Sequence, residues 1–420
     1  MAAFTSKATG NWDSEGATTW NEAGHPTAGD TVTVQNGHVV TLDSATACTD
    51  LTINSGGTVT DATNNQGLTV SNDTFVEGTL TCGSANMSFG SGREDDTALD
   101  LENGSVFTGG SGNHVIGSMR IDTCTCTLTS GTTTINGYND FAGNFYGIVL
   151  ISVTFDANGG EVIFNHATDT QEIWVASHAA YSFHDLTVNK AAGNLQFGEN
   201  SGFPLTITGD LTITSGTFAL WDGTDSADIT LTVTGTTSIT STFDGKAATT
   251  TTFSGDVTIN GGGVLTASSL TTNFGGGTWA NSGTFTHSSG LVNFTGGNQA
   301  IVGSNMWYSF SKTWAVASQP TLTIDNTSTQ TFEKNVTLEA ASAISRIHIE
   351  SDSAGNAFNF TMTADAVKAS LDFLAIKDSD ASGSNAIHKP IAPGNSTDVS
   401  GNTDWFAASV QPTQQIIIIS

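Results

Sequence analysis

The stretch Pro204-Leu-Thr-Ile-Thr-Gly-Asp-Leu-Thr-Ile213 decides the fold class of this chain, because it holds two copies of one short pattern. In each copy a threonine stands between two aliphatic residues. Alternation of apolar and hydroxyl residues has the period of a β-strand, so each copy predicts a strand whose aliphatic side chains share one face. The pattern recurs at residues 51–53, 68–70, 186–188, 231–233, 257–259, 322–324 and 336–338.

The spacing of these copies predicts how the strands are connected. Several neighbouring copies lie about 17 to 26 residues apart, which is close to the length of one coil of a parallel β-helix. A solenoid also accommodates a chain of 420 residues without several separate cores, since its core grows by stacking. The sequence therefore predicts an elongated, all-β, right-handed parallel β-helix.

A longer similarity links two parts of the chain about 130 residues apart. Residues 160–164, Gly-Glu-Val-Ile-Phe, are followed by Gln171 and Ile173, and residues 290–294, Gly-Leu-Val-Asn-Phe, are followed by Gln299 and Ile301. Both parts continue into Tyr-Ser-Phe. We interpret the similarity as an internal duplication, and chance resemblance in a chain rich in Gly and Thr is the alternative.

Composition and charge exclude several classes of function. The chain has 47 glycines, 6 prolines and only 12% charged residues, as expected for short strands joined by turns. Its 39 acidic and 11 basic residues give a net charge of −28, which argues against nucleic acid and anionic membranes as partners. The basic residues are also too widely spread for a uronate lyase, which needs them gathered in a groove.

The N-terminus and the cysteines concern the cellular setting. Residues 1–10 lack the apolar core of a secretory signal, and no apolar stretch approaches the roughly 20 residues that span a membrane. This favours a virion component released by lysis over an exported adhesin, although removal of a signal peptide would leave the same start. The 4 cysteines are too few and scattered for a disulfide framework, and we expect them to be packing residues.

Two segments carry a resemblance to a known group of proteins. The opening from Gly10 to Asp43 contains Gly-Asn-Trp, Thr-Trp and His-Pro-Thr-Ala-Gly-Asp-Thr-Val-Thr-Val, and the end contains Leu371-Asp-Phe-Leu-Ala-Ile-Lys377. Both resemble right-handed parallel β-helix (pectin-lyase-like) surface proteins of phages and bacteria, of the tail fibre, tailspike or decoration type. The resemblance implies the fold and a surface location, and it carries over no catalytic motif.

A solenoid has open ends that must be covered, which suggests a division of the chain. We expect an N-terminal cap at 1–30, β-helix parts at 31–140, 141–312 and 313–406, and a C-terminal tail for self-association or docking at 407–420. The residues expected to cap the ends are aromatic: Trp12, Trp20, Trp405 and Phe406. Four consecutive isoleucines in the tail would aggregate unless buried, so they are candidate oligomerisation or docking residues: Ile416, Ile417, Ile418 and Ile419.

Candidate ligand sites in the sequence are weak. Aromatic side chains that we expect to be exposed could stack on host glycans, with an acidic neighbour in one case: Trp221, Asp222, Trp279 and Trp307. Carboxylates near 95–96 and 222–228 are the candidates for an endoglycosidase pair. We favour the interpretation that they are solvated turn residues.

A partial calcium-loop pattern lies near the end of the chain. Asp378, Asp380 and Ser382 supply oxygen at positions 1, 3 and 5, but Lys389 stands at position 12, where an EF-hand needs Glu. We therefore interpret these residues as a structural turn and expect no cofactor, with surface calcium as the alternative.

These observations lead to one main hypothesis. We expect a non-enzymatic, structural protein of the virion surface, a tail fibre, spike or capsid decoration component, that serves display, assembly and attachment to a host surface glycan. Its partners would be other virion proteins and copies of itself, with a trimer favoured. A bacterial cell-surface adhesin or matrix protein is the second hypothesis, and a glycan-depolymerising β-helix enzyme is the third.

Overall fold

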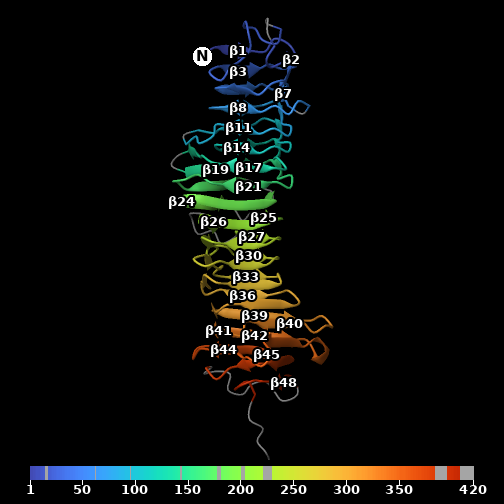
Figure 1. Cartoon of the computed structure of the whole chain (residues 1–420), viewed down its shortest axis with the longest axis vertical. Helices are drawn as coiled ribbons and strands as arrows, with labels where there is room; N and C mark the ends of the chain where they lie inside the picture. Colours follow the sequence, from blue (N-terminus) through green and yellow to red (C-terminus); the bar gives the residue numbers. More distant parts are fainter. Residues whose placement is uncertain are drawn as a thin grey trace, which may run out of the picture. The chain divides into compact units, whose positions relative to one another are not determined.

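The computed structural model describes residues 1–14, 18–61, 63–94, 96–141, 144–176, 181–199, 204–220, 229–383 and 395–406. The chain divides into unit 1, residues 1–276 and 282–290, and unit 2, residues 277–281 and 291–420. In both units short strands stack in parallel as a β-solenoid, which confirms the predicted β-helix architecture (Figure 1). The one helical segment in the described residues is the short 3-10 turn η1, Ala343–Ser345.

Three stacks of strands form unit 1. The first runs through β6 (Asp50–Ile53), β9 (Thr74–Val76), β12 (Leu99–Leu101), β15 (Met119–Asp122), β19 (Asn144–Ile151), β22 (Gln171–Ala176) and the later part of β24 (Asp185–Glu199). The second runs through β5 (Thr46–Cys48), β8 (Leu68–Val70), β11 (Met87–Phe89), β14 (His114–Ile116), β17 (Thr132–Ile135), β21 (Glu161–Phe164) and the start of β24.

The third stack of unit 1 begins with a seven-stranded sheet made of β2 (Gly10–Asn11), β4 (Val39–Thr41), β7 (Thr58–Thr60), β10 (Thr79–Thr81), β13 (Val106–Thr108), β16 (Thr125–Thr127) and β20 (Thr154–Asp156). After β20 the third stack continues with β23 (Tyr181–Phe183), β25 (Pro204–Ile207), β27 (Thr230–Val233), β30 (Thr250–Phe253) and β33 (Thr271–Phe274). The other two stacks continue from β24 through β26 (Leu211–Leu220), β28 (Thr237–Ile239), β29 (Thr242–Asp244), β31 (Val257–Ile259), β32 (Val264–Thr266) and β35 (Thr284–Thr286).

Unit 2 also has three stacks. One contains β34 (Thr278–Asn281), β37 (Gln299–Val302), β40 (Thr321–Ile324), β43 (Ile347–Ser351), β46 (Leu374–Lys377) and β48 (Thr397–Ser400). Another contains β36 (Leu291–Phe294), β39 (Ser309–Trp314), β42 (Asn335–Ala340) and β45 (Val367–Asp372). The last contains β38 (Asn305–Trp307), β41 (Thr329–Phe332), β44 (Phe358–Met362) and β47 (Ser379–Asp380).

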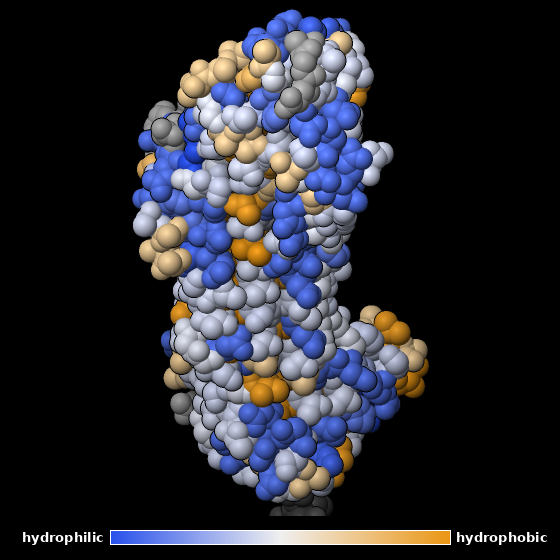
Figure 2. Space-filling model, turned by 45° about the horizontal axis from the view of Figure 1, so that its top comes forward, coloured by the Kyte–Doolittle hydropathy of each residue, from blue (hydrophilic) through white to orange (hydrophobic). Residues whose placement is uncertain are grey.

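The core of each unit is made by the predicted alternation. In β27 and in β40, Leu and Val or Ile side chains are buried while the threonines between them are only partly buried. Because side chains of a strand alternate between faces, each coil supplies aliphatic groups to the interior and hydroxyl groups to the exterior. Figure 2 shows one face of this exterior, which is mainly hydrophilic or neutral with small apolar patches.

The expected aromatic end residues have different surroundings. Trp12 and Trp20 are fully buried with ring centroids 5.5 Å apart, and Phe4 packs on Trp20 at 6.2 Å, so this N-terminal cluster is consistent with a cap. Trp405 is fully buried in unit 2, where its indole Nε1 donates to Ser379 Oγ at 2.7 Å. Phe406 is half-buried, and capping by these two residues stays a prediction.

The four cysteines, Cys48, Cys82, Cys124 and Cys126, are all buried and free of disulfide bonds, which confirms their expected packing role. Burial raises the pKa of the Cys124 thiol to about 11 and that of Cys48 to about 12. Thiols with such pKa values remain protonated at neutral pH and are poor nucleophiles and poor metal ligands.

Candidate functional site

The strongest candidate site lies on the outer side of the first stack of unit 1. In β22 the side chains of Ile173 and Val175 are fully buried, so the intervening Trp174 points away from the core and is half-buried. The same alternation holds in β9, where Thr74 and Val76 are buried and Phe75 points outward. Large aromatic side chains on the outside of a strand are available to a ligand.

Strand register places Trp174 and Phe75 in one line, which we call the outer row. Each member lies directly opposite the next across neighbouring parallel strands, so the row follows the stacking direction. Its members are Phe75 of β9, Asp100 of β12, Arg120 of β15, Val149 of β19 and Trp174 of β22.

Arg120 in the middle of the row is held by three carboxylates. Its guanidinium contacts Asp100 at 3.3 Å, Asp122 at 2.7 Å, and Glu102. Burial raises the pKa of Asp100 to about 6, and the favourable charge of Arg120 only partly offsets this effect. The cluster is therefore net negative at neutral pH, and its one cation is already neutralised by protein groups.

An aromatic pair stands at the β22 end of the row. The rings of Tyr146 and Trp174 have centroids 5.9 Å apart and are tilted by 59°. Tyr146 lies opposite Glu172 in the register, and Asn144 Nδ2 donates to the Tyr146 hydroxyl at 3.1 Å. Burial raises the pKa of Glu172 to about 7, so near neutral pH its carboxyl is present both as a hydrogen-bond donor and as an acceptor.

A hairpin brings Tyr146 to this position. β18 (Asn139–Phe141) pairs antiparallel with the start of β19, so that Asn139 lies opposite Tyr146. The Tyr138 ring, which is almost fully buried, packs edge-on against Phe145 at 4.8 Å and against His166 at 5.1 Å. The hairpin is therefore anchored to the solenoid by aromatic contacts at its base.

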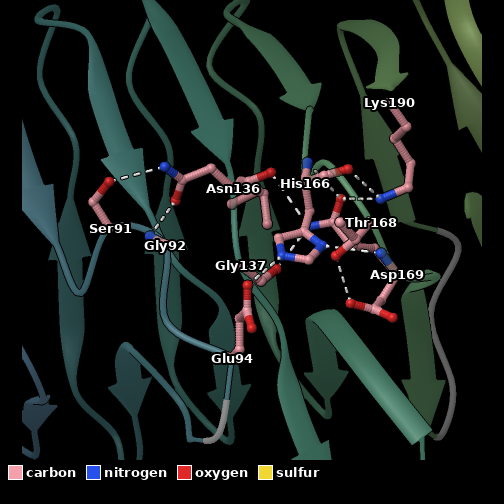
Figure 3. A network of polar contacts seen from close by, with 11 residues as sticks. Ser91, Gly92, Glu94, Asn136, Gly137, His166, Thr168, Asp169 and Lys190 are labelled. Carbon is pink, nitrogen blue, oxygen red and sulfur yellow. Dashed lines mark hydrogen bonds and ion pairs between the residues drawn. The ribbon is translucent and has the colours of Figure 1, made fainter. Parts of the chain in front are cut away.

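A network of polar contacts joins the start of β22 to residues 135–137, which precede the hairpin (Figure 3). The Gln171 side-chain amide donates to the carbonyl oxygens of Gly137 at 2.7 Å and Ile135 at 3.3 Å. Lys190, which is fully buried, donates from Nζ to Gln171 Oε1 and to the His166 carbonyl oxygen, both at 3.0 Å. Burial lowers the pKa of Lys190 to about 8, and the negative charge of Asp169 partly offsets this effect.

The same network ties the segment before the hairpin to the coil of β11, two coils earlier in the stack. His166 Nε2 lies 3.1 Å from Glu94 Oε1, and the Asn136 side chain bonds Ser91 and the Gly92 backbone at 2.8 Å (Figure 3). A side chain at Gly137 would collide with the Arg93 backbone, so glycine is required there by close approach. These contacts hold the site on rigid elements, which favours binding without a large ordering cost.

The two carboxyls of raised pKa do not form a glycosidase pair. Asp100 and Glu172 are separated by three strands and two residues along the strand, which is about 16 Å between Cα atoms. Paired glycosidase carboxyls lie about 5 to 9.5 Å apart.

The aromatic residues predicted to bind glycans lie elsewhere. Trp279 and Trp307 are fully buried in unit 2, with ring centroids 5.6 Å apart, so our expectation that they are exposed was wrong. The reason is strand parity, since both side chains fall on the inward face of their strands. Trp221 and Asp222 lie outside the described residues, as do Ile416, Ile417, Ile418 and Ile419.

The partial calcium pattern has the hydrogen bonds of turns. Asp378 Oδ2 accepts from the Gly355 backbone at 3.0 Å, and Asp380 Oδ1 accepts from the Ser382 backbone at 2.8 Å. Asp378 has a positive φ of 53°, which suits Asp in a turn. Within the described part of the chain no group of three or more His, Cys, Asp or Glu side chains is arranged to hold a metal ion.

Sequence reasoning missed Phe75, Tyr146, Glu172 and Trp174. A signal was present for Trp174, because it stands between Ile173 and Val175, which as β-branched aliphatic residues would be expected to face the core. The cluster of Arg120 with carboxylates from two coils carried no comparable signal, since it depends on the register between strands.

Comparison with protein-family models, with curated proteins and with solved structures gives no match for this chain. In the part of the chain that the structure describes, no helix has the length and apolar character of a membrane span.

Proposed function

We propose that this protein is a β-solenoid surface protein that binds a glycan on the outer face of unit 1, without catalysis. The observation that carries the proposal is the outward Tyr146–Trp174 pair beside Glu172. Tilted aromatic rings offer apolar faces to the C–H side of a sugar ring, while a neighbouring carboxyl and phenol hydrogen-bond its hydroxyls. The rigid strands and the anchored hairpin preserve this arrangement in the absence of ligand.

The proposed setting is the virion surface, as a tail fibre, spike or capsid decoration component that attaches to a host glycan. The parallel solenoid, the acidic composition and the outer aromatic site support this role. A bacterial cell-surface adhesin or matrix protein would use the same site in the same way. The proposal of a depolymerising enzyme is weaker, because Asp100 and Glu172 are too far apart to act as a pair.

We also propose that the protein forms a homo-oligomer, with a trimer favoured. The sequence of the tail contains four consecutive isoleucines, and among the described residues unit 2 exposes apolar side chains that include Val316 at 59% and Ile344 at 68%. Burial of such groups between copies would offset the repulsion of two chains that each carry −28 charges. Light scattering on the full chain and on a chain ending at Phe406 tests this, because a monomer in both cases would contradict it.

The glycan proposal is tested by screening the full chain on an array of bacterial surface polysaccharides and neutral oligosaccharides. Trp174→Ala should lower the affinity for any glycan that binds by roughly tenfold or more. Trp314→Ala is the matched control, since Trp314 is a half-buried tryptophan that belongs to unit 2, whereas Tyr146 and Glu172 belong to unit 1. Equal loss in both variants, or no binding by the wild type, would contradict the proposal, and release of reducing ends would favour the enzyme.

A further inference from the structure

The outer row is longer than one sugar ring requires. From Phe75 to Trp174 it crosses four inter-strand steps of about 4.8 Å, which is about 19 Å in all. An aromatic side chain stands at each end, and Asp100, Arg120 and Val149 lie between them. Asp100 and Arg120 are polar and half-buried, whereas Val149, next to Trp174 in the row, is apolar and almost fully buried. Two aromatic platforms with a polar stretch between them suit a chain of several sugar rings rather than a single ring.

We propose that the site takes an uncharged glycan chain that lies along the stacking direction of unit 1, from the Tyr146–Trp174 pair to Phe75. This inference rests on the proposed glycan-binding function and extends it in two ways. It assigns Phe75 and the Arg120 cluster to the same site, and it names the charge class of the ligand.

The Arg120 cluster carries the argument about charge. An anionic sugar would need a cation, but the Arg120 guanidinium already contacts Asp100, Glu102 and Asp122. A sugar carboxylate placed there would meet one neutralised cation and three protein carboxylates, so it would be repelled. Sugar hydroxyls, in contrast, can donate hydrogen bonds to these carboxylate oxygens without any change in charge.

The backbone explains why the two ends can act together. Every step of the row is an in-register parallel pairing, so the distance from Phe75 to Trp174 is set by backbone hydrogen bonds and not by flexible loops. A ligand that reaches both platforms gains the second contact at little further entropic cost, because the second contact is intramolecular.

The experiment measures affinity by calorimetry for neutral oligomers of glucose, galactose, mannose and N-acetylglucosamine, from disaccharide to hexasaccharide, with oligogalacturonates as anionic probes. We expect affinity to rise with length until the chain spans the row. Phe75→Ala should lower affinity for the hexasaccharide roughly tenfold and leave the disaccharide unchanged. Oligogalacturonates should bind at least tenfold more weakly than the neutral chain of equal length.

The outcomes separate the inference from the function on which it rests. One outcome is that Trp174→Ala abolishes binding, while affinity does not depend on oligosaccharide length and Phe75→Ala has no effect. This outcome would overturn the extended site and leave the proposed function standing. Equal or tighter binding of oligogalacturonates would overturn the charge assignment. Absence of binding by every oligomer would overturn both. Circular dichroism of Phe75→Ala establishes that the fold is retained, as expected for an outward side chain.

Discussion

Two aromatic pairs of this protein have nearly the same geometry and opposite surroundings. Tyr146 and Trp174 in unit 1 have ring centroids 5.9 Å apart and are half-buried on the outside of their strands. Trp279 and Trp307 in unit 2 have centroids 5.6 Å apart and are fully buried. The buried pair satisfies its indole N–H groups internally, with Asn305 Oδ1 and Gln330 Oε1 at 3.1 Å.

The difference in burial between the two pairs shows that aromatic content alone does not identify a ligand site in a solenoid. A buried tryptophan fills the interior and stabilises the fold, whereas an outward one leaves part of its ring surface for a partner. A shift of one residue along a strand exchanges these two roles, because side chains alternate between the faces. The predictions below test whether the two pairs divide stability and binding in this way.

The largest effect on stability is expected for the buried pair. Trp307→Ala should lower the free energy of unfolding by about 4 kcal/mol, since it leaves a cavity and removes the indole donor from Gln330. Trp174→Ala should lower it by less than about 1 kcal/mol. Denaturant unfolding followed by circular dichroism measures both, with Trp307→Phe as a milder control, and similar losses for Trp307→Ala and Trp174→Ala would contradict the comparison.

Two buried lysines, Lys190 in unit 1 and Lys312 in unit 2, allow a second comparison of stability with binding. Lys312 of unit 2 is fully buried like Lys190, and its Nζ donates to Gln299 Oε1 at 2.6 Å and to the Gly296 carbonyl oxygen at 2.8 Å. Burial lowers its pKa to about 8 as well. Lys190→Met and Lys312→Met should each cost about 3 kcal/mol of stability, because acceptors lose their donor in a buried place.

Of the two variants, only Lys190→Met should also weaken glycan binding, because Lys190 donates to the Gln171 side chain at the start of β22, whereas Lys312 donates to Gln299. Calorimetry with the best oligosaccharide distinguishes the two variants. A loss of affinity in Lys312→Met equal to that in Lys190→Met would mean that the effect is global destabilisation.

A buried group with no partner provides a contrast to both lysines. His114 packs edge-on against Phe89 and Phe107 in the core of unit 1, and neither ring nitrogen has a hydrogen-bond partner among the described residues. Burial lowers its pKa to about 4. The His114 imidazole therefore binds a proton more tightly in the unfolded chain than in the folded one. The free energy of unfolding is unaffected by this group above about pH 6.5 and falls as the pH drops toward 4.

This loss should amount to about 2.5 kcal/mol between pH 6.5 and 4 and should be absent in His114→Met. Asp100 and Glu172 contribute a pH dependence of stability with the opposite sign, because their raised pKa values make the folded state bind protons more readily than the unfolded state. The difference between wild type and variant, taken from denaturant midpoints at each pH, isolates His114. Parallel pH profiles for the two proteins would show that His114 does not titrate as expected.

The smallest effect concerns the proton on Glu172. Its pKa of about 7 means that the carboxyl loses its donor as pH rises from 6 to 8, so glycan affinity should fall over this range by roughly fivefold, the equivalent of one hydrogen bond. Glu172→Gln keeps a donor at every pH and should abolish the dependence. If glycan affinity in Glu172→Gln kept the same pH dependence, another group would be responsible for it.

The sequence predicted the fold because the deciding pattern is local. The Leu-Thr-Ile type of tripeptide contains both the strand period and the choice of inward face, and its spacing contains the length of a coil. Gln171 and Gln299 also appeared as matching positions in the sequence, and both prove to accept from a buried lysine. Their lysine partners could not be recognised, because Lys190 and Lys312 read as ordinary polar residues.

What the sequence by itself determined is therefore the class of architecture, the acidic exterior and the alternation of faces, all properties of neighbouring residues. Only the tertiary structure decided that Trp279 and Trp307 are core residues, and that Phe75, Asp100, Arg120 and Trp174 share one row. The physical reason is that the row depends on the register between coils of unequal length. Register is set by backbone pairing across the whole stack, which no single segment encodes.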